Sequence, residues 1–306
     1  MSPVVLNLFG AAVMPWLVVG GINRTRSLWT GRRGPPILQS LYDVVRLLRK
    51  TPVYSTTTTA VFRLGPWVGL AAVLASVGLV PVLGLPPMVA FPFDFVVFAA
   101  FWGLGRAVLI LGALDTGSSF EGMGAAREAT FSTILEPALL LTVGALGAVT
   151  GDHTLAGALR IDPTSASAAV AWLVSVVALT VIVLAEGARL PVDDPATHLE
   201  LTMVHEVMVL DHSGPELAAI QTASGLKLAL GVSLLATLLS PLGRSEHEAA
   251  VVGVHLLLCG GIVVAIGTME SLIARLQFRI VPRYLMVAVI AGAIALLATT
   301  WQGAPQ

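Results

Sequence analysis

Eight apolar segments, each about as long as a membrane is thick, limit what this chain can fold into. A bilayer core of about 30 Å is crossed by about 20 residues of helix. Segments of that length lie at residues 3–22, 66–84, 93–114, 131–150, 168–187, 220–240, 250–270 and 283–302. Charged residues make up only 11% of the 306 residues, against about 25% in soluble domains, and mean hydropathy is +0.88. We therefore expect an all-α integral membrane protein, a single membrane domain over residues 1–306 with about eight transmembrane helices.

The basic residues predict how the spans are oriented. Those on one side are Arg24, Arg26, Arg32, Arg33, Arg46, Arg49, Lys50, Arg63, Arg127, Arg189, Lys227, Arg275, Arg279 and Arg283, whereas the other side holds only Arg160 and Arg244. Loops that face the cytoplasm are enriched in lysine and arginine. We therefore expect cytoplasmic loops at about 23–65, 115–130, 187–219 and 271–282. Both termini should then lie on the outer side of a prokaryotic plasma membrane, with the first segment kept as a span because no signal-peptide cleavage site follows it.

The first of these loops contains a predicted amphipathic helix. Its polar face carries Gln39, Asp43, Arg46 and Lys50, and its apolar face carries Leu38, Leu41, Val45 and Leu48. Such a helix lies in the plane of the membrane interface. One interpretation is that it fixes topology and contacts anionic lipid. The other is that it forms a docking surface for a cytoplasmic partner, through Arg32, Arg33, Asp43 and Arg46.

Several ionisable residues are expected at membrane depth. A charge within a span costs about 2.5–3.5 kcal/mol on insertion scales, so it requires a partner or a function. Arg106 lies within the third span, and Glu136 lies within the fourth, just before Pro137. Asp115, Glu186 and Glu270 fall at the cytoplasmic ends of three spans. The four acids therefore come from four different spans at a similar depth.

These acids admit two interpretations. Each could extend to the interface or pair with an arginine, which we favour for Asp115 and Glu270. Alternatively, clustered acids in a low-dielectric setting can exchange protons near neutral pH. We hypothesise that a polar path into the membrane includes Glu136, Glu186, Glu200 and Glu206.

The stretch at 184–211 combines charge with apolar residues in a way that fits neither a span nor a solvated loop. Its sequence is L-A-E-G-A-R-L-P-V-D-D-P-A-T-H-L-E-L-T-M-V-H-E-V-M-V-L-D, with six acids, one arginine and two histidines. Asp194 followed by Pro195 predicts an N-cap and a first helical position. We therefore expect an amphipathic helix from Pro195 to about Asp211, at the membrane surface.

A metal site in this chain is not expected. His198, His205 and His212 recur every seven residues, which separates neighbours by roughly 10.5 Å along a helix. Two ligands of one zinc ion lie only a few ångströms apart. The chain has a single cysteine, Cys259, which excludes an iron–sulfur cluster bound within it.

Three motifs carry a resemblance that covers nearly the whole chain. They are R-R-G-P-P-I-L-Q-S-L-Y-D-V-V-R-L-L-R-K at 32–50, L-G-A-L-D-T-G-S-S-F-E-G-M-G-A-A-R-E-A-T-F-S-T-I-L-E at 111–136, and E-G-A-R-L-P-V-D-D-P-A-T-H-L-E at 186–200. On these motifs the chain resembles the membrane subunit shared by respiratory complex I, of the subunit-1 type, and membrane-bound nickel–iron (NiFe) hydrogenases. The hydrogenases include formate hydrogenlyase, hydrogenase-4 and the energy-converting hydrogenases.

The third motif also indicates a branch of this family. Residues that match the complex I pattern E-T-N-R-A-P-F-D-L-P-E-A-E are Glu186, Arg189, Pro191, Asp193, Pro195 and Glu200. Departures from it are Ala188, Val192, Asp194 and His198, and Asp115 replaces the usual arginine of the second motif. The sequence D-D-P-A-T-H-L-E is similar to the corresponding motif of the hydrogenase branch. The resemblance therefore favours a hydrogenase subunit over a quinone-binding subunit.

The resemblance implies a membrane anchor and coupling subunit without a catalytic centre of its own. Its partners would be hydrogenase-like large and small subunits, an iron–sulfur subunit and antiporter-like membrane subunits, with lipid around it and no nucleic acid. The NiFe centre and the iron–sulfur clusters would belong to the partners. The family's buried acids match Glu136, Glu186, Glu200 and Glu206. Its first-loop motif matches Arg32, Gly34, Pro35, Asp43 and Arg46.

Within this resemblance, the stretch around Arg189, Asp193, Asp194, His198 and His205 would be the loop that couples redox chemistry to movement of protons or sodium. Arg106, Asp115 and Glu270 complete the candidate path. Two alternatives remain open: a complex I-like NADH:quinone oxidoreductase subunit that lines a quinone site, and a stand-alone ion transporter.

Overall fold

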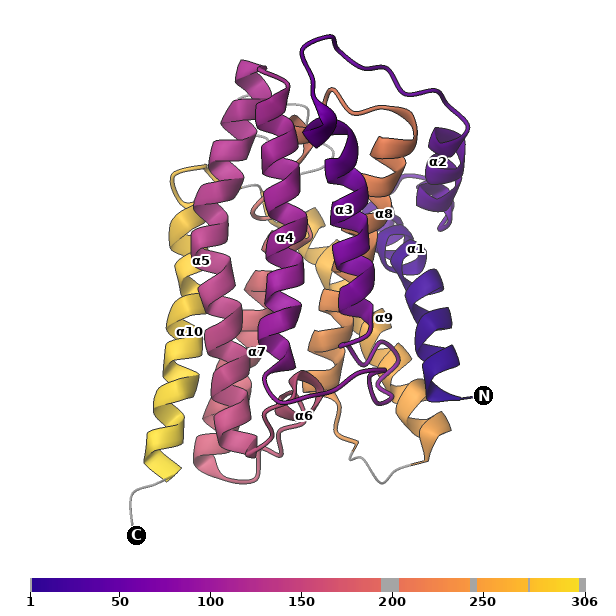
Figure 1. Ribbon diagram of the computed structural model, residues 1–306. Coiled ribbons are helices and arrows are strands. Elements are labelled where there is room, and N and C mark those ends of the chain that lie inside the picture. The colour runs from indigo at the N-terminus through magenta and orange to yellow at the C-terminus, as the bar shows by residue number, and fades with distance from the viewer. Residues whose placement is uncertain (1, 194–203, 243–246, 275, 303–306) are drawn as a thin grey trace.

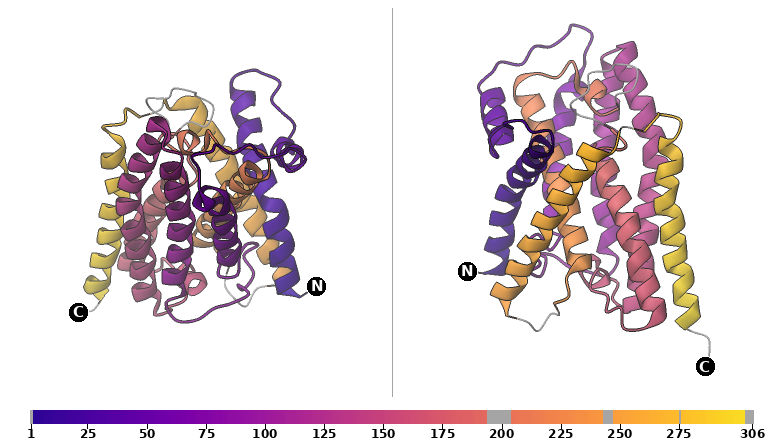
Figure 2. Two further views of the ribbon diagram at one scale, coloured as in Figure 1. Left: turned by 45° about the horizontal axis from the view of Figure 1, so that its top comes forward. Right: turned by 180° about the vertical axis from the view of Figure 1, so that it is seen from behind.

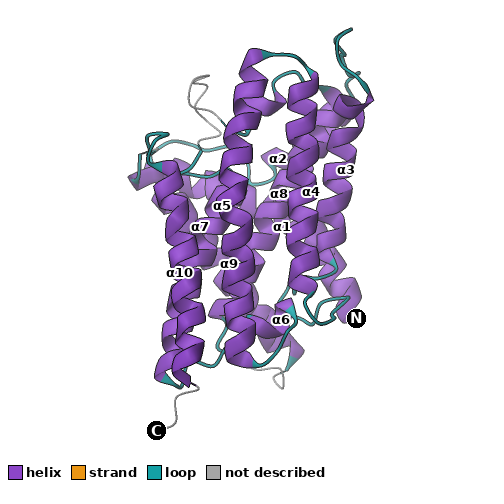
Figure 3. Cartoon of the chain, turned by 60° about the vertical axis from the view of Figure 1, so that its left-hand side comes forward, coloured by secondary structure: helices purple, strands orange, loops and turns teal. Residues whose placement is uncertain are grey.

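The protein is a bundle of long helices, as a computed structural model shows for residues 2–193, 204–242, 247–274 and 276–302 (Figure 1). The eight long helices are α1 (Pro3–Trp29), α3 (Ala60–Val77), α4 (Asp94–Asp115), α5 (Ser119–Thr150), α7 (Ala166–Glu186), α8 (Gly214–Leu239), α9 (Glu248–Leu272) and α10 (Val281–Gln302). All eight are long and apolar enough to cross a membrane. The described part of the chain contains no strand (Figure 3), so the predicted all-α membrane fold is confirmed.

Three short helices complete the fold: α2 (Gln39–Leu48), α6 (Leu155–Ala158) and the 3₁₀ helix η1 (Glu206–Val209). In Figure 1 both chain ends lie toward the end of the bundle that holds α6, whereas α2 lies toward the other end. An even number of crossings requires this arrangement. We call the two ends the α6 end and the α2 end.

Helix α8 is at the centre of the bundle. It contacts α1, α2, α3, α7 and α9, and its apolar window is the most buried of the eight. Helices α5, α7 and α10 pack together at one edge, and α1 packs beside α9 at the other (Figure 2). Large apolar side chains such as Phe9, Leu257 and Leu297 remain exposed on the outer helices. This is the pattern of a bundle that faces lipid or other membrane subunits.

Helices α1 and α5 extend well beyond their predicted ends. Helix α5 begins at Ser119 rather than near 131, so most of the predicted loop at 115–130 is helical. Residues 119–130 are too polar to count as a span, but their alanines and glutamates favour a helix. Helix α1 likewise continues to Trp29, seven residues past the predicted end.

The predicted span at 66–84 is wrong at both ends, because α3 runs from Ala60 to Val77. Residues 79–85 are buried but not helical, and they carry Pro81 and Gly84, which disfavour a continuing helix. Polar side chains from other helices bind this backbone. The Asn7 amide donates to the Pro86 carbonyl oxygen over 2.8 Å and accepts from the Leu83 N–H over 3.3 Å. The Ser233 hydroxyl lies 2.9 Å from the carbonyl oxygen of Pro81. Irregular backbone at membrane depth requires such internal partners.

The predicted amphipathic helix is present as α2, but part of its face assignment is wrong. Val44 and Leu47 are buried against α8, whereas Leu38, Val45 and Leu48, assigned to the apolar face, are exposed. The helix therefore uses one apolar strip to bind the bundle and presents a second strip outward. Arg32, Arg33 and Arg46 are exposed, and Asp43 pairs with Arg46 over 2.9 Å.

The Asn7 contacts lead to a stability prediction. An Asn7→Leu variant should unfold at lower temperature in detergent, because each buried backbone group left without a partner costs about 1–3 kcal/mol. The thermal midpoint of the purified protein measures this. Leu8→Ala is the matched control, since Leu8 is exposed on the same helix and should change the midpoint little. Equal midpoints for the two variants would contradict the assigned role of Asn7.

Candidate functional site

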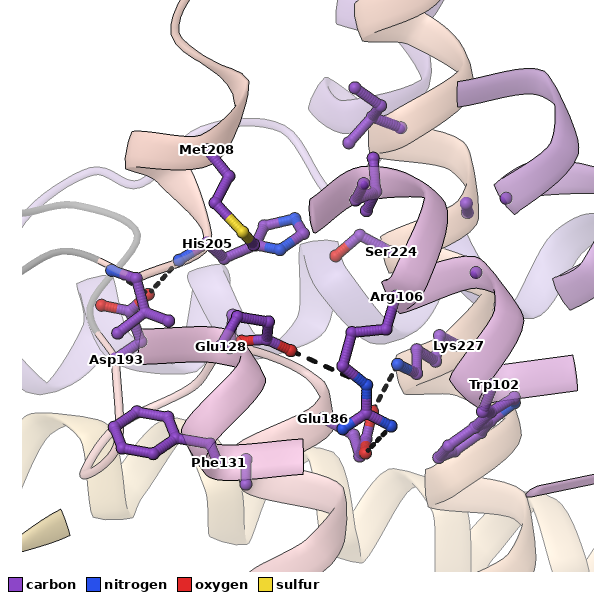
Figure 4. Close-up of a pocket in the computed structure, with 18 of the residues that line it drawn as sticks. Trp102, Arg106, Glu128, Phe131, Glu186, Asp193, His205, Met208, Ser224 and Lys227 are labelled. Atoms are coloured by element: carbon purple, nitrogen blue, oxygen red, sulfur yellow. Dashed lines mark hydrogen bonds and ion pairs between the residues drawn. The ribbon is translucent and has the colours of Figure 1, made fainter. Parts of the chain in front are cut away.

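Arg106 of α4 is a buried arginine that lies among acids from two neighbouring helices (Figure 4). Its side chain is only 4% exposed and reaches three acids. The Nη2 atom lies 2.9 Å from Glu186 Oε1 of α7 and 3.4 Å from Glu136 Oε1 of α5. The Nε atom lies 3.9 Å from Glu128 Oε1, also of α5. One arginine thus connects three helices.

Lys227 of α8 adds a second positive charge. Its ammonium group pairs with the other carboxylate oxygen of Glu186, and it lies 5.1 Å from the centre of the Trp102 ring. Figure 4 shows Arg106 and Lys227 meeting at Glu186, whose side chain is 5% exposed. We call Arg106, Glu128, Glu136, Glu186 and Lys227 the charged cluster.

The acids of the charged cluster outnumber its bases. Three acids and two bases leave one formal negative charge when all five groups are ionised. Burying a charge away from water is costly unless it is paired. The two cations therefore compensate for two of the acids, and the cluster keeps one uncompensated negative charge.

The position of Glu136 depends on a glycine. A Cβ atom added at Gly103 would lie 3.0 Å from Glu136 Oε1, closer than ordinary contact. Gly103 therefore lets the carboxylate approach α4 and reach Arg106. The Glu136 side chain nevertheless remains 44% exposed on the outside of the bundle.

A narrow cavity lies beside the charged cluster. Its volume for water-sized molecules is about 60 Å³, and its walls include Arg106, Glu128, Glu186 and Lys227. This is room for a few water molecules, since one requires about 10–15 Å³ on this measure. Sites for small organic ligands commonly measure about 300–1,000 Å³.

The loop after α7 closes the α2 end of this cavity. Asp193 and His205 lie on its wall. The Asp193 carboxylate accepts hydrogen bonds from the backbone N–H groups of Val204 and His205, over 3.3 and 3.0 Å. These bonds join the two described ends of the loop.

A second ion pair lies on another side of the same loop. Arg189 Nη1 is 3.5 Å from Glu270 Oε1 of α9, and both side chains are buried. Arg189 also lines a further cavity of about 110 Å³, together with His205, Glu206 and Gln221. This cavity shares His205 and Ser224 with the first one. Glu206 therefore lies next to the charged cluster and not within it.

Other predicted residues are placed differently. Asp115 accepts from the Thr59 N–H over 2.6 Å and from the Phe62 N–H over 3.3 Å, so it caps α3. The predicted helix from Pro195 to Asp211 is wrong in its described part, which contains only the 3₁₀ turn Glu206–Val209. Asp194, His198 and Glu200 lie outside the described residues.

His212, which follows η1, packs against α3. His212 stacks on Phe62 with ring centres 3.9 Å apart, and burial lowers the pKa of His212 to about 4. Among the described residues, no three histidine, cysteine, aspartate or glutamate side chains lie close enough together to hold a metal ion.

Two members of the charged cluster, Glu128 and Lys227, are absent from the candidates that the sequence analysis named. Lys227 falls inside the predicted span at 220–240. The cost of a charge within a span could therefore have identified it, but it was counted with the loop residues. Glu128 fell in a segment taken as loop, so its burial beside Arg106 could not be inferred.

The fold and this site define a class: a multi-pass helical membrane protein with a buried, compensated charge cluster. The comparison with known proteins gives the family. A family model described as NADH dehydrogenase matches residues 3–301, and the chain belongs to that family. The resemblance to the membrane subunit of complex I and related hydrogenases is confirmed.

Two relatives come from Escherichia coli (strain K12). Hydrogenase-4 component C is 32% identical over 234 residues, which cover 74% of this chain and 71% of the relative. Formate hydrogenlyase subunit 4 is 27% identical over 292 residues, covering 92% and 93%. A solved structure of the membrane-bound sulfane sulfur reductase, an archaeal respiratory membrane complex, contains a chain of the same fold. Its TM-score is 0.78 at 16% identity, over 96% of this chain and 97% of that one.

The burial of His212 predicts a pH dependence of stability. Its pKa is about 4 in the folded protein and near 6.5 in the unfolded chain, so the unfolded state binds more protons between these values. The stability from the neutral ring is full above about pH 6.5 and is lost as the pH falls toward 4. A His212→Phe variant should lose less thermal stability between pH 7 and pH 5 than the parent protein does.

The control is His247→Phe, at an exposed histidine before α9. It should keep the pH dependence of the parent. If His212→Phe also keeps it, another group is responsible for the acid sensitivity.

Proposed function

We propose that this chain is the membrane anchor and coupling subunit of a hydrogenase-4-like or formate hydrogenlyase-like complex. It links electron transfer in cytoplasmic partners to translocation of protons, or of sodium. The two Escherichia coli relatives support the kind of complex, because both are named as parts of such assemblies. The NiFe centre and iron–sulfur clusters belong to partner subunits, and further antiporter-like subunits share the membrane.

The observation that carries the proposal is the charged cluster. Arg106 and Lys227 hold three acids from α5 and α7 beside a water-sized cavity. One excess negative charge gives the cluster a site for one proton. A change in the position of either cation relative to Glu186 changes how strongly that proton is held, which is the requirement for coupling.

The loop after α7 transmits the change in this proposal. Asp193 and His205 line the cavity wall, and the backbone hydrogen bonds of Asp193 fix that wall in place. Arg189 and Glu270 anchor the same loop to α9. Movement of the loop by a partner subunit would therefore alter the cavity beside Glu186. Glu206, at the described end of this loop, extends the polar path toward the partner. Asp194, His198 and Glu200 are candidates for the same path but lie outside the described residues.

The exposed basic segment before α2 is the proposed docking surface. It includes Arg32 and Arg33, with Asp43 and Arg46 on α2 itself. In this arrangement the α2 end faces the cytoplasm and both termini face outward. Loss of the soluble partners from washed membranes in an Arg32→Glu, Arg33→Glu double variant supports docking, whereas unchanged retention leaves lipid contact as the role.

The two alternatives have less support. The cavity of about 60 Å³ beside Glu186 is several times smaller than common organic-ligand sites, which argues against a quinone there. The relatives are named as a component and a subunit of larger enzymes, which argues against a stand-alone transporter.

The test is Glu186→Gln in the intact complex, reconstituted in vesicles. Glutamine keeps the size of the side chain but removes the carboxylate charge that Arg106 and Lys227 bind, so the cluster loses its excess negative charge and with it the site for one proton. Proton translocation per turnover should fall about tenfold or more, as expected for loss of a positioned proton-transfer group, while the complex still assembles. Glu136→Gln should reduce translocation in the same direction.

Asp162→Asn is the matched control, since Asp162 is an exposed acid between α6 and α7. It should leave translocation unchanged. Full translocation in both glutamate variants would remove the proposed path. A preparation that purifies alone and moves ions without partners would instead support the transporter.

A further inference from the structure

A second buried protonatable group lies on α9, away from the charged cluster. His255 is only 1% exposed, and its Nε2 atom lies 3.1 Å from Ser233 Oγ of α8. Ser233 Oγ in turn lies 2.9 Å from the Pro81 carbonyl oxygen and 3.1 Å from the Val82 carbonyl oxygen. These contacts join α8 and α9 to the non-helical segment 79–85.

The hydrogen-bond pattern assigns the protons of this group. A carbonyl oxygen can only accept, so the single Ser233 hydroxyl proton is used by Pro81 or Val82. Ser233 Oγ must therefore accept from His255 Nε2, which carries the ring proton. In the neutral ring Nδ1 then bears a lone pair, and it has no hydrogen-bond partner among the described residues. A buried polar atom left without a partner is costly in a purely structural role.

Gly84 separates this free nitrogen from a surface cavity. A Cβ atom added at Gly84 would lie 3.0 Å from His255 Nδ1, and Gly84 has a positive φ of 74°. Both facts require glycine and bring the backbone against the ring. Gly84 also lines a cavity of about 460 Å³ at the α6 end, and the cavity reaches exposed Glu248 and Ala90. His255 is not on the cavity wall, and Gly84 is the residue that lies against the ring and also lines the cavity.

The charged groups on this cavity come from three segments. Arg160 donates from Nη2 to the Gly84 carbonyl oxygen over 2.6 Å. Asp152 lies on the wall between α5 and α6, and Glu248 lies at the start of α9. Arg160 holds the Gly84 backbone in place. The two acids on the cavity wall provide polar contacts for water in the cavity.

Helix α8 connects this site to the charged cluster. Ser233 follows Lys227 by six residues, a rise of about 9 Å along the helix. Toward the α2 end, α8 contacts Glu186 through Lys227. About two turns further toward the α6 end, it contacts His255 through Ser233. The two sites lie at different depths in the same bundle.

We propose that His255 is a proton-exchange site on the α6 side of the membrane, reached from the cavity above Gly84. A proton from cavity water binds the Nδ1 lone pair and gives an imidazolium, and its return to water restores the neutral ring. This inference rests on the proposed function. In it, His255 exchanges protons at the membrane surface opposite to the one that the Glu186 cluster faces. No oxidant or further reactant is required.

The experiment uses His255→Ala in the intact reconstituted complex, with small rings added to the side of the vesicle that the α6 end faces. Proton translocation per turnover should fall about tenfold in the variant and recover when imidazole is added. Pyrazole has the same size and is far less basic, so it should fill the space without restoring translocation. A ring needed only for packing would be replaced equally well by both compounds.

Equal rescue by imidazole and pyrazole would overturn the proposal, as would unchanged translocation in His255→Ala. If His255→Ala prevents assembly, His255→Gln replaces it, since its amide can still donate to Ser233 but cannot take up a proton. His247→Ala, at an exposed histidine on the same side, is the control. Loss of translocation in Glu186→Gln with full translocation in His255→Gln refutes this inference alone and leaves the proposed function intact.

Discussion

The compensation of buried charge is the constraint on which the rest of this structure depends. A bilayer provides no water to an ionised side chain, so every charge inside it requires a counter-charge at short range. Arg106 lies within ion-pair distance of three acids and, together with Lys227, compensates for two of their three charges. Because the five groups come from α4, α5, α7 and α8, the interaction also fixes how these four helices pack.

The same constraint explains the position of the irregular backbone. The segment 79–85 is buried in the bundle, and only its end at Gly84 and Leu85 borders a surface cavity. Asn7 and Ser233 supply the missing partners from α1 and α8. Helix α8 thus carries a charge for the acids and, further along, a hydroxyl for the backbone. Between these two polar contacts, α8 presents buried apolar residues such as Leu230 and Val232.

The sequence predicted the existence and number of the spans, because length and hydropathy act over about 20 residues and tolerate local error. It named Arg106, Glu136 and Glu186 among the ionisable residues at membrane depth, since the cost of an isolated charge applies wherever a span is recognised, but it did not predict that Arg106 pairs with both glutamates. Helix ends were less predictable: residues 119–130 form a helix although they are polar, and α3 stops early at Val77. The side-chain partners depend on tertiary approach. Nothing local to Asp115 shows that it caps α3 across 56 residues of sequence.

The exposed edge of Glu136 has a consequence for the assembly of the protein. Nearly half of this side chain is exposed, midway along the membrane-length helix α5. Hydrocarbon solvates a carboxylate poorly, so an exposed acid at such a position is costly unless a polar group covers it. A neighbouring membrane subunit that covers this face with a polar group would remove that cost. Contact at Glu136 would therefore favour association of the chain with such a subunit over exposure of the same face to lipid.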